Sequence, residues 1–127
     1  MAEVKLEHVN MTVRDPLATA AVLSKLFDWH IRWQGDSTQE GFSVHVGAES
    51  TYLALYARGE PPVEGIDTYG QLNGLNHLGV VVTDLDKIEE RVIAAGFKTY
   101  FHDDYEPGRR FYFEDNEGLE IEVVTYV

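Results

Sequence analysis

Three side chains of this sequence could together hold a divalent metal ion: His8, His77 and Glu122. The two histidines begin similar segments, HVNMTVRD and HLGVVVTD, which are separated by a constant offset of 69 residues. Two neutral imidazoles and a carboxylate suit Fe, Mn, Ni or Zn, and three protein ligands leave positions open for water and substrate. A single strand histidine is more often a packing residue, but recurrence in a repeat favours a ligand. The sequence therefore predicts one divalent metal ion at a catalytic site.

The carboxylate of this set lies in an alternating strand near the end of the chain, GLEIEVV. Its Leu, Ile and Val side chains fall on one side, whereas Glu120 and Glu122 fall on the other. Two carboxylates in the middle of a strand are unfavourable in a core unless a cation lies beside them. The alternative is an acidic strand on a solvated sheet face.

Neighbouring polar residues could act on a substrate. Glu120 is either a substrate-side base, with its pKa raised by Glu122, or a solvent-facing acid near the open end of the strand, and we favour the second interpretation. Arg110 and Tyr112 share a face of the preceding strand and could hold an anionic or phenolic substrate. The alternative is that Arg110 only offsets Glu114 or Glu120.

The repeated segments each begin a predicted βαβββ unit, and two such modules give an α+β fold whose curved mixed sheets surround a cleft. Asp15 and Asp84 are predicted to cap the two helices, with Pro16 in the first turn of one and Gly96 after the end of the other. We expect strands at 4–13, 29–34, 42–46 and 51–58 in the first unit and at 75–83, 97–102, 109–114 and 118–124 in the second, with polar turns at 35–41 and 103–108.

One domain is expected over residues 1–127, with module one at about 4–58, a connector or lid at 59–74 and module two at about 75–127. The chain has no cysteine, which excludes a disulfide or a thiolate site. The formal charge of −12 argues against nucleic acid and anionic membranes as partners. No stretch is long and apolar enough to span a membrane, so we expect a cytoplasmic protein.

The repeat and the tail FYFEDNEGLEIEV resemble the vicinal oxygen chelate superfamily, which contains glyoxalase, fosfomycin-resistance thiol transferases, extradiol dioxygenases and bleomycin-resistance binding proteins. The resemblance covers nearly the whole chain and implies that His8, His77 and Glu122 stand at metal positions. Ala54 stands where glyoxalases have a fourth, carboxylate ligand, which argues against glyoxalase chemistry. Asn10 stands where fosfomycin-resistance enzymes have a threonine.

The resemblance implies a metal-dependent enzyme, of the lyase, dioxygenase or transferase type, that acts on a small oxygen-rich molecule. The candidate catalytic residues are Glu122, Glu120 and Tyr112, and the candidate substrate-binding residues are Asn10, Tyr52, Tyr56, Arg110 and Tyr112. The alternative is a metal-free protein of the bleomycin-resistance type, which sequesters a cationic ligand in an acidic groove lined by aromatic residues such as Tyr69. A homodimer is expected in either case, and the metal site could form within one chain or across the dimer.

Overall fold

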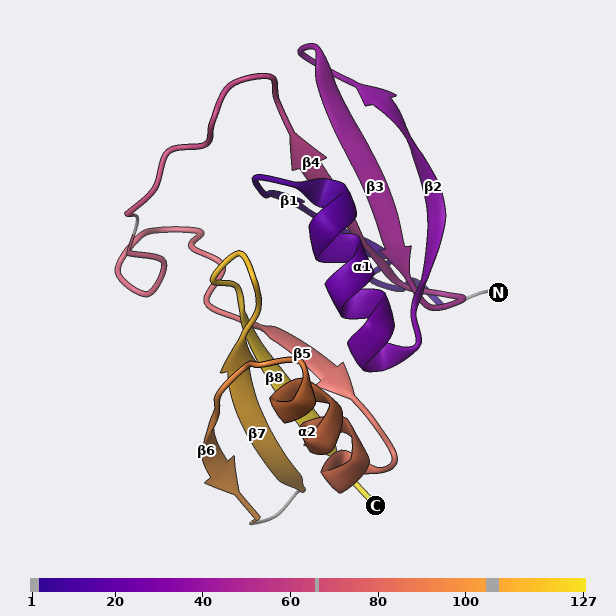
Figure 1. The fold of residues 1–127 in the computed structure, drawn as a ribbon, viewed down its shortest axis with the longest axis vertical. Helices are drawn as coiled ribbons and strands as arrows, with labels where there is room; N and C mark the ends of the chain where they lie inside the picture. The colour runs from indigo at the N-terminus through magenta and orange to yellow at the C-terminus, as the bar shows by residue number, and fades with distance from the viewer. Residues whose placement is uncertain (1–2, 66, 105–107) are drawn as a thin grey trace. The chain divides into compact units, whose positions relative to one another are not determined.

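The computed structural model of the chain describes residues 3–65, 67–104 and 108–127. It divides into two compact units, Met1–Val63 (unit 1) and Glu64–Val127 (unit 2). Each unit consists of one four-stranded mixed sheet and one helix (Figure 1). The predicted α+β fold of two tandem βαβββ modules is confirmed by this order of elements.

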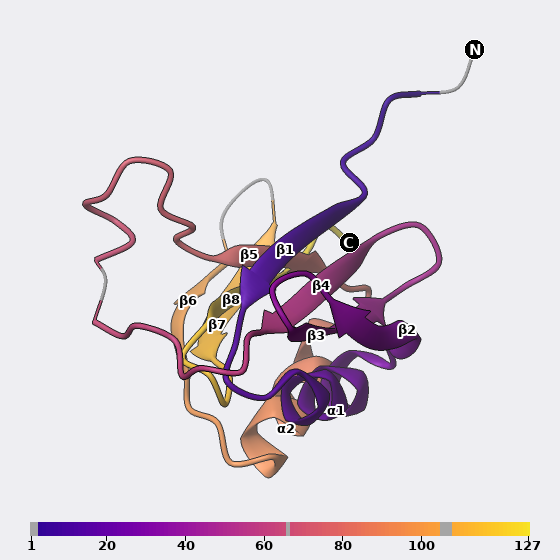
Figure 2. The same ribbon diagram turned by 90° about the horizontal axis from the view of Figure 1, so that it is seen from above.

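Unit 1 is a sheet with a helix on one face. The strand order is β1-β4-β3-β2, in which β1 and β4 are parallel and the other neighbours are antiparallel. The helix α1 packs against β3 and β4, and Figure 2 shows it below this layer of strands. The elements are β1 (His8–Thr12), α1 (Pro16–Phe27), β2 (His30–Ser37), β3 (Gly41–Gly47) and β4 (Tyr52–Ala57).

Unit 2 repeats this topology. The strand order is β5-β8-β7-β6, again with one parallel pair, β5 and β8. The helix α2 contacts β6, β7 and β8. The elements are β5 (Leu78–Val81), α2 (Leu85–Ala94), β6 (Thr99–Asp103), β7 (Arg109–Glu114) and β8 (Glu120–Thr125).

Both helices begin at the predicted aspartates. The side chain of Asp15 accepts a hydrogen bond from the backbone N–H of Ala18 at 3.1 Å, and that of Asp84 accepts one from Lys87 at 3.1 Å. Each aspartate thus satisfies a donor that the first helical turn would otherwise leave unpaired. Gly96, which follows α2, has a φ of +96°, as predicted for a residue after a helix end.

The core of each unit lies between the helix and the aliphatic face of the sheet. In unit 2 the alternation of β8 has the predicted sense, because Ile121 and Val123 are 1% and 0% exposed and face α2 with Phe111 and Phe113. In unit 1 the same layer is formed by Leu23 and Leu26 of α1 with aliphatic residues of β3 and β4. The opposite face of each sheet, which we call the polar face, carries the candidate site residues.

Several strands differ in length from their prediction, because pairing partners decide where a strand ends. The first strand was predicted at 4–13 but begins at His8, and Val4 and Leu6 before it are 97% and 80% exposed. The second strand continues beyond its predicted end to Ser37, since β2 pairs with β3 as far as Gly41. The predicted turn at 103–108 lies partly outside the described residues, which omit 105–107.

The strand registers define which positions of the two units correspond. Asn10, which lies two residues after the repeated histidine of unit 1, pairs with Ala54 of β4. Gly79, at the same point of unit 2, pairs with Glu122. Ala54 and Glu122 are therefore equivalent. The same registers make equivalent Tyr52 and Glu120, His45 and Tyr112, Ser43 and Arg110, and Trp33 and Tyr100.

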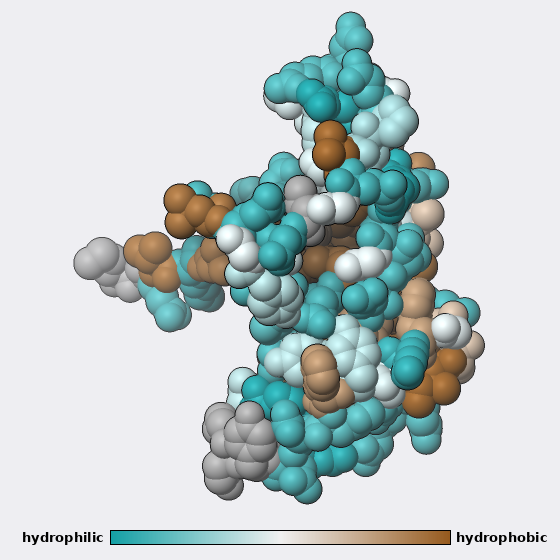
Figure 3. All heavy atoms as spheres, turned by 90° about the vertical axis from the view of Figure 1, so that its left-hand side faces the viewer, coloured by the Kyte–Doolittle hydropathy of each residue, from teal (hydrophilic) through white to brown (hydrophobic). Residues whose placement is uncertain are grey.

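The surface is mainly hydrophilic on the side shown in Figure 3. Neither α1 nor α2 is long and apolar enough to cross a membrane, and no other helix in the described part of the chain is either.

Candidate functional site

Glu122 is the centre of a hydrogen-bonded network on the polar face of unit 2. Its Oε1 atom lies 3.0 Å from His77 Nε2 and accepts a hydrogen bond from the Tyr112 hydroxyl at 3.0 Å. Its Oε2 atom accepts a hydrogen bond from Arg110 Nη1 at 2.8 Å. The side chains of Glu122 and Arg110 are only 13% and 16% exposed. A carboxylate this far from water needs such partners, and the guanidinium also offsets its charge.

Glu120 joins the same network through two tyrosines. Its Oε1 atom accepts a hydrogen bond from the Tyr69 hydroxyl at 2.6 Å, and its Oε2 atom accepts one from Tyr100 at 2.7 Å. These bonds stabilise the carboxylate, so the pKa of Glu120 is lowered, first by Tyr69, even though burial acts in the opposite direction. The raised pKa that belonged to the interpretation as a substrate-side base is therefore wrong. The side chain is 18% exposed, so it faces solvent only in part.

The tyrosines of this network hold their protons more tightly than usual. Burial, together with the bond to Glu122, raises the pKa of Tyr112 to about 12. Burial and the bond to Glu120 raise the pKa of Tyr100, and the bond to Glu120 raises that of Tyr69. At neutral pH these phenols are hydrogen-bond donors and not bases.

The donor set of unit 2 fits a divalent ion. The 3.0 Å between His77 Nε2 and Glu122 Oε1 matches two ligands at about 2.1 Å from one ion. His77 Nδ1 is buried without a hydrogen-bond partner among the described residues, and it lies 4.0 Å from Glu120 Oε1. If an ion took the Nε2 position, the ring proton would move to Nδ1, where Glu120 is the nearby acceptor.

His8 of unit 1 has a different environment. Its side chain is 43% exposed, and its Nδ1 atom lies 2.9 Å from Glu7 Oε1. This contact favours the tautomer that carries its proton on Nδ1, which leaves Nε2 as the atom for a metal. Within the described residues, however, no group of three or more His, Asp or Glu side chains is gathered closely enough to hold a metal ion. His77 and Glu122, whose nearest atoms lie 3.0 Å apart, form a pair of potential ligands.

The polar face of unit 1 carries a ring cluster in place of a carboxylate network. The ring of Tyr52 stacks on that of His8 with centroids 4.9 Å apart and on that of His45 at 4.7 Å. The guanidinium of Arg32 lies 4.4 Å from the centroid of Tyr52, and Trp33 tilts against His45 at 5.0 Å. The pKa of His45 is lowered, first by burial and then by the charges of His8 and Arg32. We call these five residues the unit 1 cluster.

The remaining candidate residues of unit 1 are less involved. Ala54 is buried. Asn10, its partner in β1, is exposed. The hydroxyl of Tyr56 donates to the backbone carbonyl of Thr38 at 2.8 Å, which links β4 to the β2–β3 turn.

Four residues of these two faces carry no signal in the sequence that predicts them as site residues: Tyr100, Phe101, Arg32 and His45. Arg32 and Phe101 lie at β-bulges, in β2 and β6 respectively. The register of β6 shifts between Tyr100 and Asp103, and Phe101 has a φ of +52°. Consecutive Tyr100 and Phe101 therefore both contact the ring of Tyr112, at 6.3 and 5.9 Å, instead of pointing to opposite faces. A sequence pattern with a period of two assigns consecutive residues to opposite faces, so it cannot predict that both reach the same ring.

The comparison with known families identifies the fold. Residues 5–123 match the model of the Glyoxalase/Bleomycin resistance protein/Dioxygenase superfamily. No curated protein sequence matches the chain.

Solved structures give the same result. A glyoxylase/bleomycin resistance protein/dioxygenase domain from Frankia sp. EAN1pec has a TM-score of 0.83 and 22% identity, covering 99% of this chain and 100% of its own. The glyoxalase family protein from Enterococcus faecalis has a TM-score of 0.74 and 19% identity, covering 94% and 96%. A mutant of the fosfomycin resistance protein FosX from Listeria monocytogenes, complexed with Mn(II) and 1S,2S-dihydroxypropylphosphonic acid, has a TM-score of 0.72 and 18% identity, covering 97% and 93%. At these identities the likeness establishes the fold alone.

Proposed function

Because the chain belongs to the Glyoxalase/Bleomycin resistance protein/Dioxygenase superfamily, we propose that it is a divalent-metal-dependent enzyme acting on a small oxygen-rich molecule. The proposed metal ligands are His8, His77 and Glu122. The observation that carries the proposal is the contact of His77 Nε2 with Glu122 Oε1 at 3.0 Å, on a rigid sheet and with a further carboxylate beside the other ring nitrogen. The Mn(II) complex of the Listeria protein supports a divalent ion.

The ion would supply Lewis-acid polarisation of a substrate oxygen. Arg110 holds Oε2 of Glu122 and so fixes the direction of Oε1. Tyr112, protonated at neutral pH because of its raised pKa, donates its O–H to Glu122, so its hydroxyl oxygen can accept a hydrogen bond from a substrate hydroxyl. Glu120, with its lowered pKa, is a weak base, and we propose that it orients the ring of His77 instead of taking a proton from the substrate.

Metal binding tests this proposal directly. We expect untagged protein, purified without chelator, to contain a divalent metal by elemental analysis. Mn, Fe(II), Ni or Zn should raise the melting temperature by about 5 °C or more at saturation. The shift should disappear in His77→Ala and Glu122→Gln and weaken in His8→Ala.

Two histidines outside the proposed site provide matched controls. His102 of unit 2 contacts Glu89, and His30 of unit 1 is exposed, so His102→Ala and His30→Ala should keep the full metal shift. A shift that survives His77→Ala, or that is lost equally in the control variants, would show that the metal binds elsewhere. A screen of catechols, hemithioacetals and epoxides with the metal-loaded protein then addresses the reaction type.

A second candidate is a metal-free binding protein, and one observation favours it. Arg110 already pairs with Glu122 at 2.8 Å, so the carboxylate carries a neutralising partner without any metal. If no metal is bound, the carboxylates and tyrosines of unit 2 would instead hold an organic cation. Such a ligand should raise the melting temperature of the metal-free protein, and Glu120→Gln should reduce that shift.

The homodimer and the cytoplasmic location stay proposals in either case. Sedimentation equilibrium on the metal-free and metal-loaded protein tests the first. A mass of 14.4 kDa under both conditions would exclude the dimer.

A further inference from the structure

The unit 1 cluster contains a cation that no carboxylate neutralises. Among the described residues, the guanidinium of Arg32 contacts the ring of Tyr52, at 4.4 Å, and has no ion-pair partner. This is unusual in a chain with 22 acidic and 10 basic residues. Glu7, the acid near this cluster, is paired with His8 at 2.9 Å. A guanidinium that lies against a ring keeps its in-plane N–H groups available for a carboxylate.

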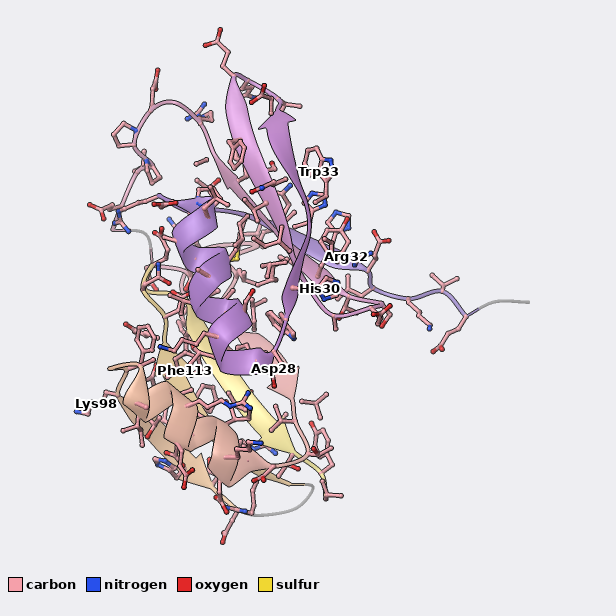
Figure 4. The ribbon with its side chains drawn as sticks, turned by 45° about the vertical axis from the view of Figure 1, so that its right-hand side comes forward. Asp28, His30, Arg32, Trp33, Lys98 and Phe113 are labelled. Carbon is pink, nitrogen blue, oxygen red and sulfur yellow. The ribbon has the colours of Figure 1, made fainter. Side chains whose placement is uncertain are left out.

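A β-bulge brings a large aromatic side chain beside this cation. The register of β2 against β3 shifts between Ile31 and Trp33, which makes Arg32 the extra residue of the strand. Arg32 and Trp33 therefore project from the same side of β2, away from α1 (Figure 4). Their contacts agree, since Arg32 reaches Tyr52 and Trp33 reaches His45 on the polar face.

The indole of Trp33 is held in place although it is half exposed. It packs on Gly35 of its own strand, where a Cβ atom would approach the ring to 2.8 Å, and it is tilted against the ring of His45 at 5.0 Å. The residue is still 49% exposed. A fixed, accessible ring next to an unpaired guanidinium is suited to a flat ligand with a negative group at its edge.

From this combination we propose that the unit 1 cluster binds a planar aromatic carboxylate. Arg32 binds the carboxylate and Trp33 packs on the ring of the ligand. The unit 1 cluster shares His8 with the proposed metal site, but the two contacts proposed here, from Arg32 and Trp33, require no ion.

Binding can be measured by NMR from the indole N–H signals of the two tryptophans. Trp33 reports on the cluster, and Trp29, which packs against Phe27, is an internal control. The probes are benzoate, benzamide, which has the ring without the charge, and acetate, which has the charge without the ring. They are added to the full chain in the presence of a chelator, so that a bound ion cannot supply the anion contact.

We expect benzoate to shift the Trp33 signal saturably, with a dissociation constant of about 1 mM or tighter. Benzamide and acetate should bind at least about fivefold more weakly, since each lacks one of the two contacts. Arg32→Ala should weaken benzoate binding by about tenfold, whereas Arg58→Ala should change it less than about twofold. Arg58 is the matched control, because it lies in the same unit but contacts Gln39.

The proposal is overturned if benzoate binds no better than benzamide, or if the two arginine variants lose equal affinity. It is also overturned if Trp33 shows no saturable shift up to about 20 mM benzoate, well above the expected constant. These results would leave the metal proposal untouched, since that proposal is measured with metal on His77 and Glu122 variants.

Discussion

The two units share one topology, yet they stabilise their polar faces in different ways. In unit 2 two carboxylates on β8 are nearly removed from water and are satisfied by a histidine, an arginine and three tyrosines. In unit 1 the equivalent positions are Tyr52 and Ala54, and the face is organised by ring stacking. Repetition of the backbone therefore preserves positions but not chemistry.

The repeated histidine shows this difference most clearly. His8 stacks on a ring and is 43% exposed, whereas His77 is 33% exposed and contacts Glu122. The difference follows from the side chain that each histidine contacts, which is Tyr52 on β4 for His8 and Glu122 on β8 for His77. Unit 1 has Ala54 at the position of Glu122 and Ser43 at the position of Arg110, so it lacks both members of the ion pair of unit 2.

The largest expected effect concerns the ion pair of Arg110 and Glu122 in unit 2, which is mostly buried. Arg110→Ala should lower the free energy of unfolding by about 2 kcal/mol, because it leaves Glu122 mostly buried beside no cation. Urea unfolding monitored by circular dichroism measures this change. The double variant Arg110→Ala with Glu122→Gln should recover part of the loss, since the amide carries no charge.

Two other arginines test whether burial is the cause. Arg109 is adjacent in the sequence, and its pair with Asp86 is exposed, at 51% and 73%. Arg32 of unit 1 has no carboxylate partner among the described residues. Arg109→Ala and Arg32→Ala should each cost less than about 0.5 kcal/mol. If either costs as much as Arg110→Ala, the two polar faces are not distinguished by a buried charge.

A second difference lies between the helix and the sheet. In unit 1, Ala20 of α1 is 0% exposed. The equivalent position of α2, 69 residues later, is occupied by Glu89. Glu89 Oε2 lies 2.6 Å from both Thr99 Oγ1 and His102 Nε2. Burial would raise the pKa of Glu89, but these two hydrogen bonds outweigh it and the pKa is lowered.

The pH dependence of stability should reveal this carboxylate. A lowered pKa in the folded state means that the stabilisation is present above the unfolded value of 4.5 and is lost as the pH falls through the folded value. Glu89→Gln should therefore cost about 1 kcal/mol near pH 6 and progressively less towards pH 3. Urea titrations at several pH values measure the difference from wild type. A difference that is constant with pH would contradict a role for the ionised form.

Much of the fold could be predicted from the sequence, because its signals are local or repeated. Asp15 and Asp84 mark helix starts through side chains that cap the next turn. The offset between His8 and His77 reveals the duplication, and the alternation of β8 gives the face of Glu122. All of these depend on residues close together in the chain or on a fixed period.

The contacts of the candidate site were harder to predict, for two physical reasons. Tyr69 reaches Glu120 from an irregular segment 51 residues away, and no periodic pattern covers that segment. Arg32 and Phe101 reach the polar faces because β-bulges break the alternation on which face assignments rest. The direction of the Glu120 pKa shift depends on those contacts, so the sequence alone suggested only the repulsion between neighbouring carboxylates.

The smallest expected effect concerns a single hydroxyl on each face. Tyr112 donates to the charged Glu122, whereas Tyr56 donates to a neutral backbone carbonyl. Tyr112→Phe should cost about 0.7 kcal/mol and Tyr56→Phe less, because hydrogen bonds to charged groups are stronger.

This cost should also depend on pH in the alkaline range. Since the pKa of Tyr112 is raised to about 12, the contribution is complete below the unfolded value of 10.0 and is lost as the pH rises through the folded value. The phenolate absorbance of wild type and Tyr112→Phe, recorded between pH 9 and pH 12, should differ mainly at the upper end of that range. If the absorbance difference between the two proteins instead appears near pH 10.0, the Tyr112 proton is not held by Glu122. The polar face of unit 2 would then be no more tightly hydrogen-bonded than that of unit 1.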